Sequence, residues 1–154
     1  MPEALIANIP DSQLSGSGYF DYRYDYSRSR LYTQGDPNGI GGAWAADPSV
    51  VGEYIQADFG QLQRIQAIDT QGRQDWSNWV TSYKFAYSTD GVTYDYVTSD
   101  DGSDRVFGGN SDRDTVVENS FDAPIVARFV RLYPQTYHDN MSLRWEVYGC
   151  SYNG

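Results

Sequence analysis

Hydrophobic and polar residues alternate along much of this chain. The clearest run covers residues 141–148, where apolar side chains at the odd positions alternate with polar positions that include Arg144 and Glu146. A period of two directs one set of side chains into a core and the other outward. Residues 83–87 and 55–59 repeat the pattern. The pattern therefore predicts three strands, with a half-buried one at 141–148.

A further segment is apolar on both faces. Residues 125–132 carry only Arg128 and Arg131 as polar positions, which is typical of a central strand. No window has helical spacing. Turn signals separate the apolar segments, at residues 36–39, 41–42, 90–91, 101–102 and 108–109. Short apolar segments separated by turns at this spacing predict an all-β sandwich or barrel.

Composition and charge narrow the possible functions. The 154 residues, 40% of them hydrophobic, suffice for one sizeable core, so we predict a single domain over residues 1–154. The net charge is −10 and Lys84 is the only lysine among eleven basic residues, so no nucleic-acid partner is expected. The same charge weakens attraction to anionic lipids. No apolar run reaches the ~20 residues of a membrane span, and no signal peptide is apparent.

Catalytic patterns are weak in this sequence. The chain has one histidine, His138, and one cysteine, Cys150, so neither a catalytic triad nor a histidine-rich metal site can be assembled. The acidic residues lie in turn-like clusters, and no pair is placed by its spacing for acid-base chemistry. We therefore expect no enzyme and no catalytic residues.

Several motifs occur in the order found in one known family. Residues 70–91, which read Thr-Gln-Gly-Arg-Gln-Asp-Trp-Ser-Asn-Trp at their start, are the most informative. The others are Ile9-Pro-Asp-Ser-Gln-Leu14, Ser27-Arg-Ser-Arg-Leu31, Gly109-Asn-Ser-Asp-Arg113, Ala127-Arg-Phe-Val-Arg131 and Ser142-Leu-Arg-Trp-Glu-Val-Tyr-Gly-Cys150. Over nearly its whole length the chain resembles the discoidin domain, or coagulation factor five/eight type C domain, especially discoidin-lectin and retinoschisin-like members. The resemblance implies a jelly-roll β-sandwich of the galactose-binding-domain type, with loops at one end forming the binding face.

The resemblance also implies a non-catalytic binding or adhesion module, which is extracellular as part of a larger secreted chain. Cys150 matches a family cysteine whose disulfide partner would lie beside Met1. Because Met1 is not a cysteine, Cys150 is expected to be a free thiol, and the two chain ends are expected to lie close together.

Three segments between the predicted strands are candidates for binding. Residues 19–26 alternate tyrosines with charged residues and form either a surface strand or a binding loop. Residues 36–44 are rich in glycine and either display Ile40 or simply connect two strands. Trp76, among turn-forming polar residues, is expected to be exposed. Trp79 is in phase with the strand at 83–87 and is expected in the core.

The candidate ligand-binding residues are aromatic or apolar loop residues with neighbouring hydrogen-bonding groups. They are Tyr22, Tyr24, Tyr26, Ile40, Arg73, Asp75, Trp76, Asn78, His138 and Asn140. Aromatic faces stack on the C–H groups of sugars while polar side chains bind the hydroxyls, so a neutral, galactose-type glycan of the cell surface or matrix is the expected partner.

Two alternatives stay open, because members of the family bind different ligands. One is a phosphatidylserine membrane, with aromatic tips in the bilayer interface and Arg23, Arg28 and Arg73 at the headgroups. The other is a protein-contact adhesion domain without a small ligand.

Calcium is the one cofactor to consider. Some lectin-like relatives bind it through an aspartate in the loop before the first matched tryptophan. Here that loop reads Gly39-Ile-Gly-Gly-Ala-Trp44, and only Asp36 and Asn38 remain nearby as oxygen ligands. We therefore expect neither a metal site of that kind nor any other cofactor.

Overall fold

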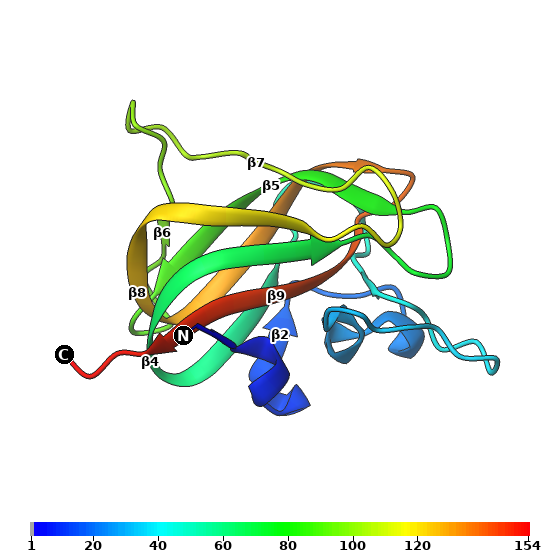
Figure 1. Ribbon diagram of the computed structural model, residues 1–154. Coiled ribbons are helices and arrows are strands. Elements are labelled where there is room, and N and C mark those ends of the chain that lie inside the picture. Colours follow the sequence, from blue (N-terminus) through cyan, green and yellow to red (C-terminus); the bar gives the residue numbers. More distant parts are fainter. Residues whose placement is uncertain (1) are drawn as a thin grey trace.

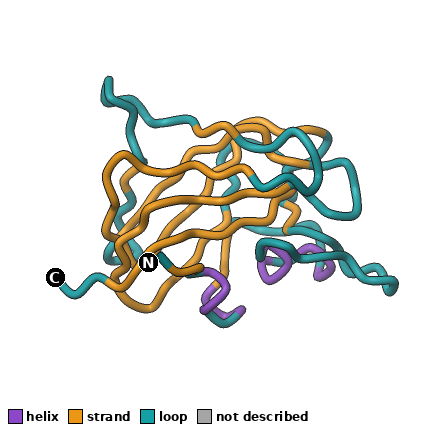
Figure 2. Tube along the Cα trace, viewed as in Figure 1, coloured by secondary structure: helices purple, strands orange, loops and turns teal. Residues whose placement is uncertain are grey.

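The computed structural model describes residues 2–154 and shows a β-sandwich of antiparallel strands (Figures 1 and 2). The longer strands are β4 (Ile55–Gln71), β5 (Trp79–Ser88), β8 (Val117–His138) and β9 (Ser142–Ser151). The short ones are β1 (Glu3–Ala4), β2 (Leu14–Gly16), β3 (Trp44–Ala45), β6 (Asp95–Tyr96) and β7 (Phe107–Gly108). The helices are single 3₁₀ turns, η1 (Ile6–Asn8), η2 (Asp11–Gln13), η3 (Tyr22–Tyr24) and η4 (Tyr26–Ser29). The predicted all-β fold without a helical layer is confirmed for the described residues.

Strands β4 and β8 are long because each contributes to both layers. The first part of β4, up to Asp58, pairs with β2 and with the second part of β8. After an irregular stretch between Asp58 and Gln63, β4 continues between β9 and the first part of β8. Neighbouring strands pair in the order β1-β9-β4-β8-β5-β6. In addition, β3 pairs with β9 and β7 pairs with β5. The two layers are thus connected through the bends of β4 and β8.

The core confirms the alternation in two of the predicted strands, and the topology confirms the predicted central strand. Ile55, Ala57 and Phe59 are buried on β4, and Tyr83 and Phe85 on β5. Strand β8 lies between β4 and β5, as expected of a central strand. Alternation is therefore a reliable guide where a strand has one face in the core.

The two ends of the chain lie side by side. Glu3 pairs with Gly149 and Ala4 with Tyr148, next to Cys150, which confirms the expected proximity. Cys150 is a half-buried free thiol. Met1, the position matched to the missing cysteine, lies outside the described residues.

The strand predicted at residues 141–148 is present as β9, but the prediction that this strand is half-buried is wrong. On β9, Arg144 and Glu146 are as buried as the apolar residues between them, with exposed fractions of 2% and 4%. Loop segments cover the second face of this strand, and the two charged side chains hold those segments in place. Glu146 accepts hydrogen bonds from the backbone N–H groups of Ile6 and Ala7 at 2.6 and 2.9 Å. Burial raises the pKa of Glu146, and these donors only partly offset the effect.

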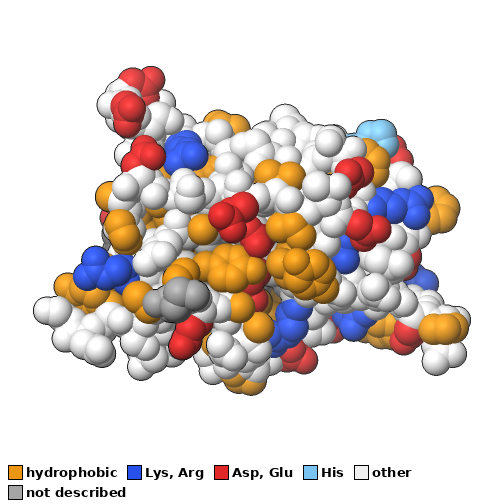
Figure 3. Space-filling view, viewed as in Figure 1, with side chains coloured by type: hydrophobic (Ala, Val, Ile, Leu, Met, Phe, Trp, Pro, Cys, Tyr) orange, Lys and Arg blue, Asp and Glu red, His pale blue; other side chains and the backbone are white. Residues whose placement is uncertain are grey.

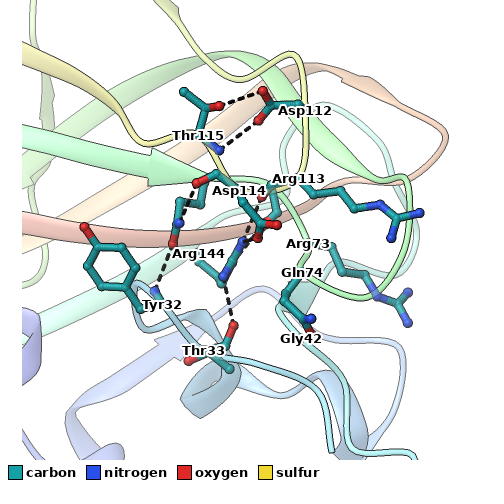
Figure 4. Close-up of polar contacts among 12 residues, drawn as sticks. Tyr32, Thr33, Gly42, Arg73, Gln74, Asp112, Arg113, Asp114, Thr115 and Arg144 are labelled. Carbon is teal, nitrogen blue, oxygen red and sulfur yellow. Dashed lines mark hydrogen bonds and ion pairs between the residues drawn. The ribbon is translucent and has the colours of Figure 1, made fainter.

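Arg144 connects the sheet to three separate loops (Figure 4). Its guanidinium donates to the backbone oxygens of Thr33 at 2.9 Å, Gly72 at 2.7 Å and Arg113 at 2.7 Å, and to the carboxylate of Asp114 at 2.9 Å. A planar group with five donors suits such a task because it satisfies several oxygens in fixed directions. Arg144 therefore fixes where these loops begin and end relative to β9.

Trp79 is not a core residue, contrary to the prediction. It is half-buried and stacks on His138, with ring centroids 4.5 Å apart and an interplanar angle of 12°. The cause is irregular pairing with β8, whose register shifts between Val80 and Ser82 and again between Ser82 and Tyr83. Each shift breaks the period of two. Val80 and Tyr83 are consequently the buried residues.

An acidic group lies on the face formed by β4, β8 and β9, where Figure 3 shows red side chains beside large hydrophobic ones. Asp69 on β4 is paired with Glu118 on β8 and is only 6% exposed. Burial and the neighbouring Glu118 raise the pKa of Asp69 from 3.8 to about 6, although a hydrogen bond with Tyr148 opposes them.

Asp69→Asn is expected to stabilise the domain at pH 7.5, and by about half as much at pH 5. Folded Asp69 binds its proton more tightly than the unfolded chain does, so stability falls as pH rises from the unfolded value of 3.8 to about 6, and the full penalty persists above that. We expect a gain of about 1–2 kcal/mol at pH 7.5, below the full shift because Glu118 is open to solvent. Urea unfolding at several pH values measures this. The exposed Asp95→Asn is the control, and parallel pH profiles for both variants would contradict the account.

Candidate functional site

Four loop segments meet at the end of the sandwich opposite the chain termini (Figures 1 and 2). They cover residues 19–29, 32–43, 72–78 and 139–141, which lie outside the long strands. The predicted clustering of loops at one end is therefore confirmed. A ligand site here would be built from side chains that are far apart in the sequence.

A cavity of about 290 Å³ lies among these loops. Its lining combines aromatic rings, small apolar side chains and polar groups: Phe20, Tyr24, Ala45, Ala46, Asp47, Ser49, Arg73 and Asn140. Three of them, Tyr24, Arg73 and Asn140, belong to the predicted set. Ligand sites generally start at about 300 Å³, so the cavity suits a small ligand.

Arg73 is the central polar group of this cavity. Its Nε donates to Asp75 Oδ1 at 2.7 Å, and one Nη donates to the Tyr24 hydroxyl at 3.1 Å. The guanidinium also lies 4.6 Å from the centre of the Tyr24 ring, within range of a cation–π contact. With only 14% of its side chain exposed, Arg73 is held in one orientation before any ligand arrives.

Asp75 balances the charge of Arg73. Burial alone would raise the pKa of Asp75, but the hydrogen bond and the charge of Arg73 outweigh burial and lower it. The same carboxylate accepts the backbone N–H of Gly42 at 3.1 Å. Arg73 and Asp75 therefore form an ion pair at neutral pH, with no excess positive charge.

The glycine-rich segment positions Tyr24. Gly41 is buried against this tyrosine, and a Cβ atom on Gly41 would collide with the ring. The N–H of Gly41 donates to the backbone oxygen of Arg23 at 2.8 Å. Phe20 meets Tyr24 edge to face, with centroids 6.0 Å apart, and is 59% exposed. The segment thus shapes an aromatic wall and is more than a connection.

Ser49 and Asn140 add hydrogen-bonding groups. Ser49 Oγ donates to Asn140 Oδ1 at 3.1 Å and accepts the N–H of Met141 at 3.0 Å. The contact fixes the Asn140 amide and leaves its Nδ2 group without an acceptor among residues 2–154. Asp47 contributes an exposed carboxylate to the same lining. Donors and acceptors therefore face one small space.

Three predicted residues lie in the loop-end segments or at the adjoining end of β8, but not in the lining of the cavity. Tyr22 and Trp76 are 69% and 60% exposed, so the expected exposure of Trp76 is confirmed. His138 is exposed and stacked on Trp79. A contact between any of the three and a ligand stays a prediction.

Three other predicted residues are placed differently from the expectation. Tyr26 packs against the core, because the segment around it folds into 3₁₀ turns and not into a strand with a tyrosine face. Ile40 is half-buried and not displayed at a loop tip. Asn78 is only 1% exposed, and its backbone oxygen accepts the N–H of Arg73 at 2.8 Å to close the turn.

Phe20, Asp47 and Ser49 also line the cavity but were not predicted from the sequence. Phe20 lies at the start of the tyrosine-rich segment and could have been predicted, because it is a further aromatic residue in a candidate loop. Asp47 and Ser49 lie in an ordinary turn-like stretch, and only the folded chain brings them beside Arg73 and Asn140.

Trp76→Ala and Trp79→Ala are expected to differ in stability. Removing the exposed Trp76 should change the free energy of unfolding by no more than about 0.5 kcal/mol. Removing the half-buried Trp79 loses its stacking on His138 and should cost about 1–2 kcal/mol, less than the 3–5 kcal/mol of a core tryptophan. Urea unfolding of both variants measures this. Equal losses would contradict the positions described.

The chain matches known proteins over nearly its whole length. The family model described as F5/8 type C domain matches residues 12–147. Mouse lactadherin is 37% identical over 150 residues, which cover 92% of this chain and 31% of lactadherin. Mouse retinoschisin is 36% identical over 151 residues, covering 97% of this chain and 64% of retinoschisin. The chain thus spans about a third of one relative and less than two thirds of the other.

Solved structures agree with the fold. Recombinant discoidin II of Dictyostelium discoideum superimposes with a TM-score of 0.85 at 28% identity, over 99% of this chain and 60% of that one. The family 32 carbohydrate-binding module of Clostridium perfringens NanJ gives a TM-score of 0.63 at 15% identity, over 97% and 98% of the two chains, and shares the fold. No helix among residues 2–154 is long and apolar enough to cross a membrane. The chain belongs to the F5/8 type C, or discoidin, domain family, a family of binding modules with a β-sandwich fold.

Proposed function

We propose that this domain binds a neutral saccharide in the cavity at its loop end. One observation carries the proposal: aromatic rings and hydrogen-bonding groups of both kinds line a single space of about 290 Å³. A sugar ring presents apolar C–H faces and a periphery of hydroxyls, each of which is donor and acceptor. The lining matches both parts of such a ligand.

Individual groups of the lining have distinct roles in this proposal. The exposed ring of Phe20 offers a face for stacking against C–H groups. Arg73 and the Asn140 amide donate to ligand oxygens, while Asp47 accepts from hydroxyls. Because Asp75 balances the charge of Arg73, a neutral ligand suits the site better than an anionic one.

A galactose-type sugar is the ligand we favour. The NanJ carbohydrate-binding module, which shares the fold, was solved in complex with galactose, and this supports the choice of ligand class. The natural partner would be a cell-surface or matrix glycan outside the cell, bound without catalysis. No metal is part of the proposal, and Asp36 Oδ1 already accepts the N–H groups of Asn38 and Ile40 at 2.9 and 3.1 Å.

Membrane binding is the second candidate, favoured by the exposed aromatic residues Phe20, Tyr22 and Trp76. The arginines required for it, however, already have protein partners. Arg23 pairs with Asp21 at 2.6 Å, and Arg28 donates to the backbone oxygens of Gly41 and Gln34 at 2.9 and 2.7 Å. Arg73 pairs with Asp75 at 2.7 Å. These contacts support the saccharide over the anionic lipid.

A glycan array run beside sedimentation with phosphatidylserine vesicles tests the proposal. Binding to neutral, galactose-type glycans that changes little between low and high salt is expected, because the site has little Coulomb attraction to screen. If the domain binds no glycan but binds vesicles at low salt, and loses this binding at high salt and in Trp76→Ala, membrane binding would replace the saccharide proposal. If the domain binds neither glycans nor vesicles, a protein-contact adhesion domain is the function that remains.

A further inference from the structure

A second groove lies at the opposite end of the sandwich. It is formed where the loop after β6, residues 97–105, faces the bend of β8 at residues 121–125, and its volume is about 280 Å³. In Figure 1 the loop after β6 projects at the far end from the loop that follows β4. None of the residues that line the loop-end cavity belongs to this groove.

The base of this groove is apolar. Tyr87, Val97, Phe121 and Ile125 line it, and all four are partly buried against the core. Two of the four, Tyr87 and Phe121, are aromatic. The groove therefore offers stacking surface to an apolar part of a ligand.

The charged side chains of the groove make no hydrogen bond or ion pair within residues 2–154. The Arg105 guanidinium lies 4.3 Å from the centre of the Phe107 ring. In residues 2–154 it makes no ion pair, although Asp100 and Asp122 line the same groove. A half-buried guanidinium with five free donors thus shares one space with two free carboxylates.

The mixture of charges defines the ligand. A simple anion would be attracted by Arg105 but repelled by the carboxylates of Asp100 and Asp122. A simple cation would be attracted by the carboxylates but repelled by Arg105. A compact neutral ligand with hydroxyls satisfies all three, because each hydroxyl can donate to a carboxylate and accept from a guanidinium. We propose that this groove is a second saccharide site, selective for a neutral sugar.

The consequence is a domain with two sites at opposite ends. Such a domain can bridge two glycans, and when both belong to one surface the second contact gains from high effective concentration. The inference stands on residues separate from the loop-end cavity, so either site can fail without the other.

Amide chemical-shift titrations with galactose, N-acetylglucosamine and mannose test the second site. At least one sugar should produce saturable shifts in residues 97–105 and 121–125. Arg105→Ala and Asp122→Asn should each weaken binding there by about 10-fold or more, since hydrogen bonds to charged groups are lost. Asp122 is exposed, so Asp122→Asn guards against misfolding of the Arg105 variant. The exposed Arg64→Ala, outside both sites, is the control.

The outcomes separate this inference from the proposed function. Arg73→Ala should remove shifts at the loop end and leave those of the groove unchanged. Groove shifts that are absent with all three sugars, or unaltered in both groove variants, would overturn the second site. Saturable shifts with lysine methyl ester alone would assign the groove to a cation and overturn it as well.

Discussion

Arg144→Ala is expected to lower the free energy of unfolding by about 3–5 kcal/mol, because it removes a buried guanidinium that makes one buried and three partly buried hydrogen bonds. The side chain is 2% exposed and makes four hydrogen bonds of 2.7 to 2.9 Å. Three of the acceptors are backbone oxygens of different loops, so the variant loses the contacts that join these loops to β9. This is the largest stability effect that we expect from a polar residue.

Urea unfolding compares Arg144→Ala with Arg64→Ala, an exposed arginine that makes a cation–π contact with Tyr152. The control should lie within about 0.5 kcal/mol of the unaltered protein. Arg144→Lys should recover only part of the loss, because an ammonium group cannot reproduce the planar set of donors. A loss below about 1 kcal/mol in Arg144→Ala would show that the loops do not depend on this residue.

Arg73→Ala is expected to weaken saccharide binding by about 10- to 100-fold, the equivalent of one or two hydrogen bonds to a charged group. The change removes the central donor of the cavity and leaves Asp75 without its ion pair. It also frees Tyr24, whose hydroxyl accepts from Arg73 at 3.1 Å. Titration calorimetry with a galactoside measures the effect.

Arg113→Ala is the matched control for this loss. Arg113 belongs to the same end of the molecule and donates to Ser77 Oγ at 3.0 Å, but it does not line the cavity. Binding to a neutral sugar should be unchanged in Arg113→Ala. If both variants lost binding equally, a general effect of positive charge would explain the result better than the cavity does.

The sequence predicted the fold well because the signals for a β-sandwich are local. Alternation at 55–59 and 83–87 and the family motifs could be read without knowing which segments pair. Periodicity was wrong for Trp79, because irregular pairing with β8 shifts the phase at Ser82. It was also wrong for Arg144, because loops from elsewhere in the chain cover the second face of β9.

The site was harder to predict than the fold. Tyr24, Arg73 and Asn140 were found as aromatic or polar loop residues, and the structure brings them to one cavity. Asp47 and Ser49 carry no local signal, because their role arises only from the approach of distant loops. The partner of a loop residue depends on the fold of the whole chain, and a local pattern does not contain that information.

The most direct test of the central claim is an amide chemical-shift titration of the domain with a galactoside at 50 and 500 mM salt, concentrations that differ about threefold in screening length. The account predicts saturable shifts centred on residues 20–24, 45–49, 73 and 140, with nearly equal affinity at both salt concentrations. Saturable shifts that lie only at other residues would contradict it. So would the absence of shifts with every neutral sugar if phosphatidylserine vesicles bind the domain at low salt.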